Sequence, residues 1–116
     1  MKIYIAGRIT GNPNYKAQFK ATASMLQEEG YTVLNPAELP EGMKPADYMR
    51  ICFAMLESAD VVLFQHGWQE SKGAKLEYDY AKYIGKKNII FNDSLDNYKD
   101  KIKSIAVMMR WMMDEN

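Results

Sequence analysis

Glu77 is the side chain of this sequence whose position most strongly indicates a chemical task. Residues 72–84 have the spacing of an amphipathic helix, with charged side chains along one arc and apolar side chains along the opposite one. At about 100° per residue, Glu77 projects on the apolar side, beside Ala74 and Ala81, and therefore toward the interior. A carboxylate in such a place is unfavourable unless it has bonding partners or a functional role.

Three structural alternatives could explain Glu77 without a function: a helix cap, a buried ion pair, or a glutamate at the edge of the buried face that reaches water. The cap is the weakest of these. With Ser71 as N-cap, the reciprocal glutamate of a capping box belongs at position 74, which is alanine. A functional role is favoured because Glu77 falls in the second turn of a helix that starts at a predicted ligand crevice.

Two glycine-containing turns have the features of a phosphate site. Ser71 precedes Lys72 and Gly73, so it can cap a helix whose free amides attract phosphate, and the glycine lets a ligand approach the backbone. The segment GRITG adds a second turn with free amides and an arginine, a planar cation suited to phosphate. The glycines of this segment do not have the spacing of the dinucleotide-binding motif or of the phosphate-binding loop of P-loop proteins. The residues expected to line a phosphate and sugar pocket are Gly7, Arg8, Ile9, Thr10, Ser71 and Gly73.

Two aromatic residues near these turns each have two interpretations. Tyr4 lies in the middle of a predicted strand, where an aromatic side chain is either core or part of a site. Trp68 lies in a glycine-containing loop, where it either covers the core or stacks on a base. Asp60 is expected to bond local amides, and His66 is expected to be solvated.

Short apolar runs alternate with segments of helical spacing along the chain. The runs predict strands at residues 2–6, 31–34, 61–64 and 88–91. Helices are predicted at 15–29, 45–57 and 72–84. A last amphipathic helix is expected to carry on one stripe Leu95, Tyr98, Ile102, Ile105, Met109 and Met112.

This alternation predicts an α/β domain of the Rossmann-like or flavodoxin-like kind, with three layers. A parallel sheet of about four strands, in the order 2-1-3-4, would have helices on both faces. In that order, ligands bind between the carboxyl ends of strands one and three. The loops at 7–14 and 65–73 are therefore expected to meet at the ligand site.

Composition gives no support to several classes of partner. The chain of 116 residues is expected to form one domain over 1–116, and its 15 basic and 15 acidic residues cancel, so neither a nucleic acid polymer nor a membrane surface is favoured. One cysteine, Cys52, and one histidine, His66, are too few soft ligands for a transition-metal site. We expect no metal or other cofactor, a small-molecule ligand, and a cytoplasmic location.

Several motifs taken together resemble those of the nucleoside 2-deoxyribosyltransferase superfamily, and most closely its DUF4406 branch. They extend over roughly residues 1 to 91 and comprise MKIYIAGRITG, the pair Asn35 and Pro36, SADVVLF, and GWQESKGAKLEYDYAKYIGK. The resemblance implies that Glu77 is a nucleophile that attacks the anomeric carbon and that Tyr4 orients it. Serine at position 71, where nucleoside-specific members have aspartate, implies a 5′-monophosphate.

The resemblance implies a reaction and also contains one departure. We expect cleavage or transfer at the N-glycosidic bond of a (deoxy)nucleoside 5′-monophosphate, with Glu77 and Tyr4 as catalytic residues and Trp68 among the substrate-binding ones. Superfamily enzymes usually have an acidic residue eight positions before the aspartate of the ADVV segment, and here that residue is Cys52. The alternative is therefore a nucleotide-binding or sensing module that retains the pocket without turnover.

The carboxyl-terminal helix is richer in apolar residues than packing on one sheet requires. Its apolar side chains fall on more than one face: Met108, Met109, Trp111, Met112 and Met113. Exposed apolar patches often mark interfaces, although a methionine-rich end can also simply fray. Because members of the superfamily typically pair to complete a pocket, we expect a homodimer or larger even-numbered oligomer.

Overall fold

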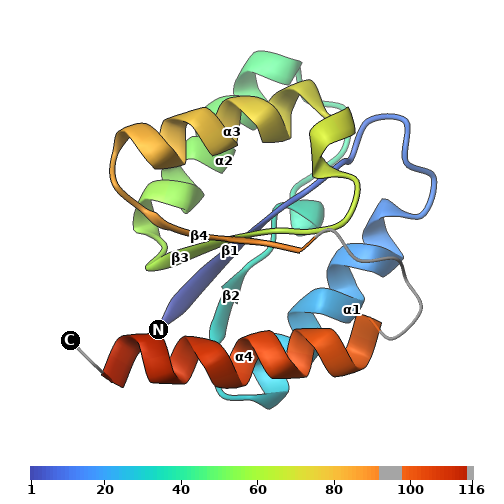
Figure 1. The fold of residues 1–116 in the computed structure, drawn as a ribbon. Helices are drawn as coiled ribbons and strands as arrows, with labels where there is room; N and C mark the ends of the chain where they lie inside the picture. The colour runs from blue at the N-terminus through green and yellow to red at the C-terminus, as the bar shows by residue number, and fades with distance from the viewer. Residues whose placement is uncertain (92–97, 115–116) are drawn as a thin grey trace.

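Short apolar segments form a central sheet, and the segments of helical spacing surround it (Figure 1). The computed structural model describes residues 1–91 and 98–114. In chain order the elements are β1 (Lys2–Ala6), α1 (Tyr15–Glu28), β2 (Thr32–Leu34), the 3-10 helix η1 (Pro36–Glu38), α2 (Pro45–Ser58), β3 (Val61–Phe64), the 3-10 helix η2 (Trp68–Glu70), α3 (Lys72–Tyr83), β4 (Lys87–Ile90) and α4 (Tyr98–Asp114). The ends that the sequence predicted for the first three helices and the strands lie within one residue of these bounds.

The sheet has the predicted order, β2-β1-β3-β4, and its strands are parallel. Tyr4 in β1 pairs with Leu34 in β2 on one side and with Val62 in β3 on the other. Because the chain moves outward in opposite directions from β1 and β3, the loops that follow these two strands lie next to each other. The two loops that were predicted to form the ligand crevice are therefore neighbours in this strand order.

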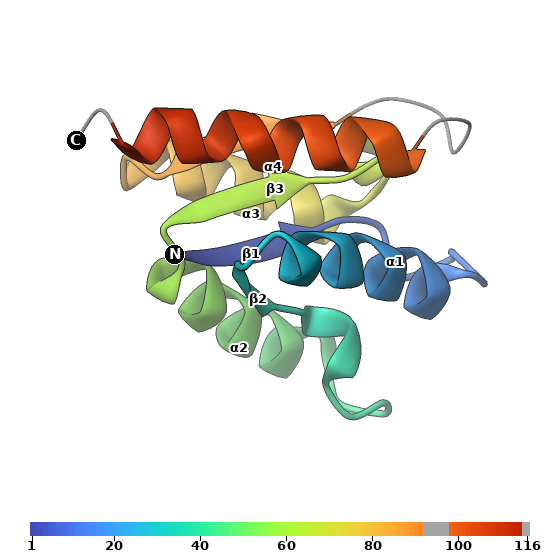
Figure 2. The same cartoon turned by 90° about the horizontal axis from the view of Figure 1, so that it is seen from below.

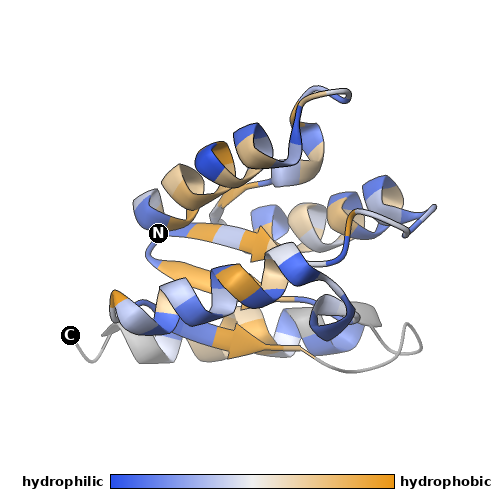
Figure 3. Cartoon of the chain, turned by 90° about the horizontal axis from the view of Figure 1, so that it is seen from above, coloured by the Kyte–Doolittle hydropathy of each residue, from blue (hydrophilic) through white to orange (hydrophobic). Residues whose placement is uncertain are grey.

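Side chains of the central strands alternate between two apolar layers. Ile3 and Ile5 of β1 face α1 and α4, whereas Tyr4 and Ala6 face α2 and α3. Figures 1 and 2 show the two pairs of helices on opposite faces of the sheet. In Figure 3 the apolar strands appear in orange between helices of mixed hydropathy. The α/β fold with three layers is confirmed.

Helix α4 packs against α1 and buries only part of its apolar surface. Met109 is buried and Ile105 packs against the same layer, as the predicted stripe requires. Met108 and Trp111 are 60% and 73% exposed. Leu95 and the side chains of Tyr98, Ile102, Met112 and Met113 lie outside the described part of the protein. Self-association through this helix stays a prediction.

Within residues 1–91 and 98–114, no helix is both long and apolar enough to span a membrane.

Gly7 allows the end of β1 to approach the buried side chain that follows β3. A Cβ atom at position 7 would lie 2.7 Å from both Cγ and Nε2 of Gln65 and 3.1 Å from Cζ of Phe19. Gln65 is fully buried, and its Oε1 accepts a hydrogen bond of 2.9 Å from the Thr22 hydroxyl on α1. This polar contact inside the fold therefore requires a glycine beside it.

We expect Gly7→Ala to lower the free energy of unfolding by about 1–3 kcal/mol, because the new methyl group must displace Gln65 or Phe19 in a close-packed interior. Urea unfolding measures this change. Ser24→Ala, at an exposed position of α1, is the control and should change stability by no more than about 0.5 kcal/mol. A Gly7→Ala variant as stable as the native protein would contradict the account of this contact.

Candidate active site

Tyr4 and Glu77 meet in the buried layer between the sheet and α3. Tyr4, the third residue of β1, is 1% exposed, and Glu77, in the second turn of α3, is 5% exposed. The Tyr4 hydroxyl donates a short hydrogen bond to Oε2 of Glu77. The inward direction predicted for Glu77 is thus what the structure has, and a tyrosine hydroxyl is its hydrogen-bond partner.

The surroundings of Glu77 determine its protonation. Burial raises its pKa to about 7, and the hydrogen bond from Tyr4 opposes that increase. Burial and the neighbouring Glu77 carboxylate in turn raise the pKa of Tyr4 well above its usual value, so the tyrosine stays protonated and can donate. Near neutral pH, both forms of the Glu77 carboxyl group are therefore populated.

The structural alternatives for Glu77 fit this geometry poorly. Among the ion pairs of the described residues, none includes Glu77, so it is not held there by a cation. It lies beyond the first turn of α3, where Ser71 performs the capping, and its small exposed fraction means that it does not reach bulk water. A buried carboxylate with a perturbed pKa is a candidate for a functional role, and that role of Glu77 stays a prediction.

Cys52 of α2 lies beside this pair. It is 7% exposed and belongs to the same buried apolar layer as Tyr4. Burial raises the pKa of the Cys52 thiol, so this group stays neutral at physiological pH. The third member of the buried cluster therefore supplies neither a negative charge nor an acidic proton.

The start of α3 has the predicted cap. Ser71 Oγ accepts a hydrogen bond of 3.1 Å from the backbone amide of Ala74. A Cβ atom at Gly73 would lie 3.3 Å from Sδ of Met49 in α2, so glycine at 73 lets the Met49 side chain pack closely against the helix start. The predicted cap is confirmed, and the phosphate subsite at Ser71 and Gly73 stays a prediction.

The loop after β1 contains three further residues predicted to bind the ligand, and they point in different directions. Arg8 extends toward the loop after β3, where its Nη1 forms an ion pair of 3.2 Å with Oε2 of Glu70. Thr10 is exposed. The Ile9 side chain packs against the apolar layer on the α1 side, so only its backbone remains for a ligand on the α3 side.

Trp68 occupies the core position rather than a stacking platform. It is 6% exposed, and its ring centroid lies 5.2 Å from that of Phe64 and 4.9 Å from that of Tyr78. Gly67, which precedes it, has a φ of 88°, a left-handed conformation that favours glycine. Of the two interpretations of Trp68, the structure favours packing against the core.

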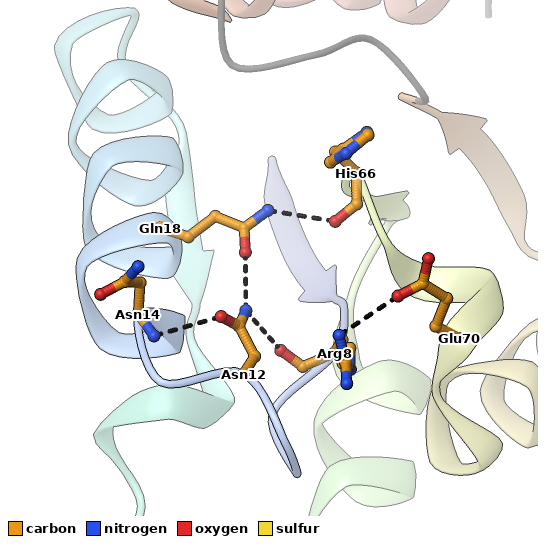
Figure 4. Close-up of polar contacts among 6 residues, drawn as sticks. All are labelled: Arg8, Asn12, Asn14, Gln18, His66 and Glu70. Atoms are coloured by element: carbon orange, nitrogen blue, oxygen red, sulfur yellow. Dashed lines mark hydrogen bonds and ion pairs between the residues drawn. The ribbon is translucent and has the colours of Figure 1, made fainter.

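A cavity of 220 Å³ lies between the loops after β1 and β3 (Figure 4). Asn12 Nδ2 donates to the Arg8 carbonyl at 3.2 Å and to Gln18 Oε1 at 3.0 Å, and Gln18 Nε2 donates to the His66 carbonyl at 3.1 Å. The cavity is lined by Arg8, Asn12, Asn14, Gln18, His66, Gly67 and Glu70.

Sequence reasoning named both loops but missed Asn12, Gln18 and Glu70. The clustering of polar side chains in residues 7–14 and 65–73 was the available signal for Asn12 and Glu70. Only the structure reveals that Gln18, from the first turn of α1, reaches across to the second loop. Among the described residues, no three His, Cys, Asp or Glu side chains are grouped to hold a metal ion.

Comparisons with known proteins agree with the motifs. Residues 1–91 match the family described as Domain of unknown function (DUF4406). A protein of Thermofilum pendens (strain DSM 2475 / Hrk 5), provisionally named 2′-deoxynucleoside 5′-phosphate N-hydrolase 1, is 27% identical over 122 residues, which cover 100% of this chain and 81% of that protein.

The fold is similar to that of the 2-desoxiribosyltransferase from Leishmania mexicana, with a TM-score of 0.65 and 19% sequence identity. The match covers 80% of this chain and 65% of the Leishmania protein, so this chain spans about two thirds of its length. At this identity the likeness concerns the fold alone. The family match over most of the sequence shows that the chain belongs to the DUF4406 family, as the motifs predicted. The names of the two similar proteins agree with the predicted resemblance to the nucleoside 2-deoxyribosyltransferase superfamily.

Proposed function

We propose that this protein cleaves or transfers at the N-glycosidic bond of a (deoxy)nucleoside 5′-monophosphate, with Glu77 as the nucleophile. The observation that carries the proposal is the buried Glu77 carboxyl group, which has the Tyr4 hydroxyl as its hydrogen-bond partner and is in none of the ion pairs of the described residues. Support also comes from the Thermofilum relative, whose name describes a hydrolase of 2′-deoxynucleoside 5′-phosphates.

The distance along α3 suits such a substrate. Ser71 and Glu77 are six residues apart on one helix, which corresponds to about 9 Å along its axis at 1.5 Å per residue. A phosphate at the helix start, bound by the amides near Gly73 and by Arg8, would leave the sugar over the next turn, near Glu77. A 5′-phosphate and an anomeric carbon lie at opposite ends of the same sugar, so one nucleotide can contact both groups.

The reaction proposed for this arrangement has two steps. Ionised Glu77 attacks the anomeric carbon, a bond forms from its carboxylate oxygen, and the bond to the base nitrogen breaks with its electron pair leaving on the base. Water or a second base then attacks the same carbon from the opposite face, the bond to Glu77 breaks, and the carboxylate is restored. The departed base takes up a proton from solvent, and the attacking water or second base releases a proton to solvent. Tyr4 orients the carboxylate through its hydroxyl in both steps.

Cys52 favours a second candidate function, a nucleotide-binding or sensing module. Where superfamily enzymes usually have an acidic residue to handle the leaving base, this protein has a buried thiol whose pKa is raised by burial. Incubation with a panel of nucleotides separates the two functions. Release of free base supports the enzyme, whereas thermal stabilisation by an intact nucleotide supports the sensor.

Glu77→Gln is expected to reduce release of the base by at least about a thousandfold, because the amide has the shape of the carboxyl group but is not a competent nucleophile. Chromatography of the free base measures the reaction, and thermal unfolding verifies that the variant is folded. Asp79→Asn is the matched control, since it removes an exposed carboxylate from the same helix and should retain activity. Turnover by Glu77→Gln at the native rate would remove Glu77 from its role.

Tyr4→Phe is expected to move the acid limb of the pH–rate profile to higher pH. In the native protein the rate should rise with pH through about 7, as Glu77 ionises. The Tyr4 hydrogen bond lowers the pKa of Glu77, so its removal leaves the effect of burial unopposed and raises that pKa. The rate measured across pH tests this, with the exposed Tyr83→Phe as a control that leaves the profile unchanged. An acid limb that stays in place, or moves to lower pH, would mean that Tyr4 does not tune Glu77.

A further inference from the structure

The ion pair between Arg8 and Glu70 lies where the proposed phosphate subsite should be. Arg8 follows Gly7 at the end of β1, and Glu70 directly precedes Ser71, the N-cap of α3. Their charged groups are 3.2 Å apart and join the loops that follow β1 and β3 (Figure 4). A carboxylate is therefore bound to the cation that the proposed function assigns to a phosphate.

This ion pair is not needed to hold the two loops together. The side chains of Arg8 and Glu70 are 37% and 69% exposed, and ion pairs this exposed contribute little to stability. A second, uncharged connection joins the same loops, from Asn12 to Gln18 and from Gln18 to the His66 carbonyl. Because these amide bonds also fix the Arg8 carbonyl through Asn12, the loop can keep its backbone conformation when the ion pair breaks.

The guanidinium group of Arg8 has a second neighbour besides Glu70, the turn at Gly11. A Cβ atom at Gly11 would lie 3.0 Å from Nη2 of Arg8, so the guanidinium rests against the turn at Gly11 while Nη1 faces Glu70. An anion that replaces Glu70 would thus find a cation already in place. The dianionic phosphate of a nucleotide is also a stronger acceptor for arginine than a single carboxylate.

We propose that Glu70 is a specificity-determining residue that competes with the substrate phosphate for Arg8. Without ligand, the Glu70 carboxylate occupies the guanidinium, and a nucleoside 5′-monophosphate must displace it before its phosphate binds there. Glu70 therefore weakens binding of phosphate-bearing ligands and leaves unphosphorylated nucleosides unaffected. This inference rests on the proposed function for the location of the phosphate, but it does not depend on cleavage.

The test is calorimetric titration in a Glu77→Gln background, so that no ligand is consumed. The four common deoxynucleoside 5′-monophosphates, the corresponding nucleosides and inorganic phosphate are the probes, at one pH and low ionic strength. Glu70→Gln should tighten binding of the monophosphates that bind by about three- to tenfold and change nucleoside binding by less than about twofold. Glu41→Gln is the matched control for net charge, because Glu41 forms a similarly exposed ion pair with Lys16 elsewhere on the surface.

The Arg8→Gln background separates competition from simple charge repulsion. If Glu70 acts through Arg8, Glu70→Gln should no longer tighten monophosphate binding once Arg8 is replaced. The proposal would be overturned if Glu70→Gln increased monophosphate affinity equally in the Arg8→Gln background, or if Glu41→Gln gave an equal increase. It would also be overturned if Glu70→Gln alone gave no increase, or if no nucleotide of the panel bound. Tighter monophosphate binding in Glu70→Gln, without base release by the native protein, would retain this inference and reject the proposed catalysis.

Discussion

The hydrogen bond between Tyr4 and Glu77 is the interaction on which the account of this protein depends. Burial of a carboxyl group is unfavourable, and one hydroxyl partner offsets only part of that penalty, which is why the pKa of Glu77 lies at about 7. The bond can form only if the middle of β1 and the second turn of α3 are held at a fixed distance. Parallel pairing of β1 with β3, and the apolar packing of α2 and α3 on that face, provide this constraint.

The same constraint divides the site into two parts with different physical character. Glu77, Tyr4 and Cys52 lie in a buried layer where electrostatic interactions are strong and few groups are charged. Arg8 and Glu70 lie at the surface, where ion pairs are weak and easily exchanged. A ligand that used both parts would find its charged end recognised at the surface and its reacting carbon brought to the buried carboxylate.

Sequence reasoning predicted the fold almost completely and the site in part. Element bounds and the inward direction of Glu77 follow from periodicity, which a local pattern of residues determines, whereas the strand order follows from the alternation of strands and helices. The side-chain directions of Ile9 and Trp68 depend instead on how irregular loops pack, and here the structure places both in apolar layers. The contact of Arg8 with Glu70 joins residues 62 positions apart, for which no periodic pattern exists.

Detection of a covalent intermediate on Glu77 tests the central claim most directly. After rapid quenching of a reaction with a nucleoside 5′-monophosphate, mass spectrometry of the peptide that contains Glu77 should find an added sugar phosphate without the base. The adduct should be absent in the Glu77→Gln variant. Release of base with no adduct on Glu77, or with an adduct on a different residue, would contradict the account.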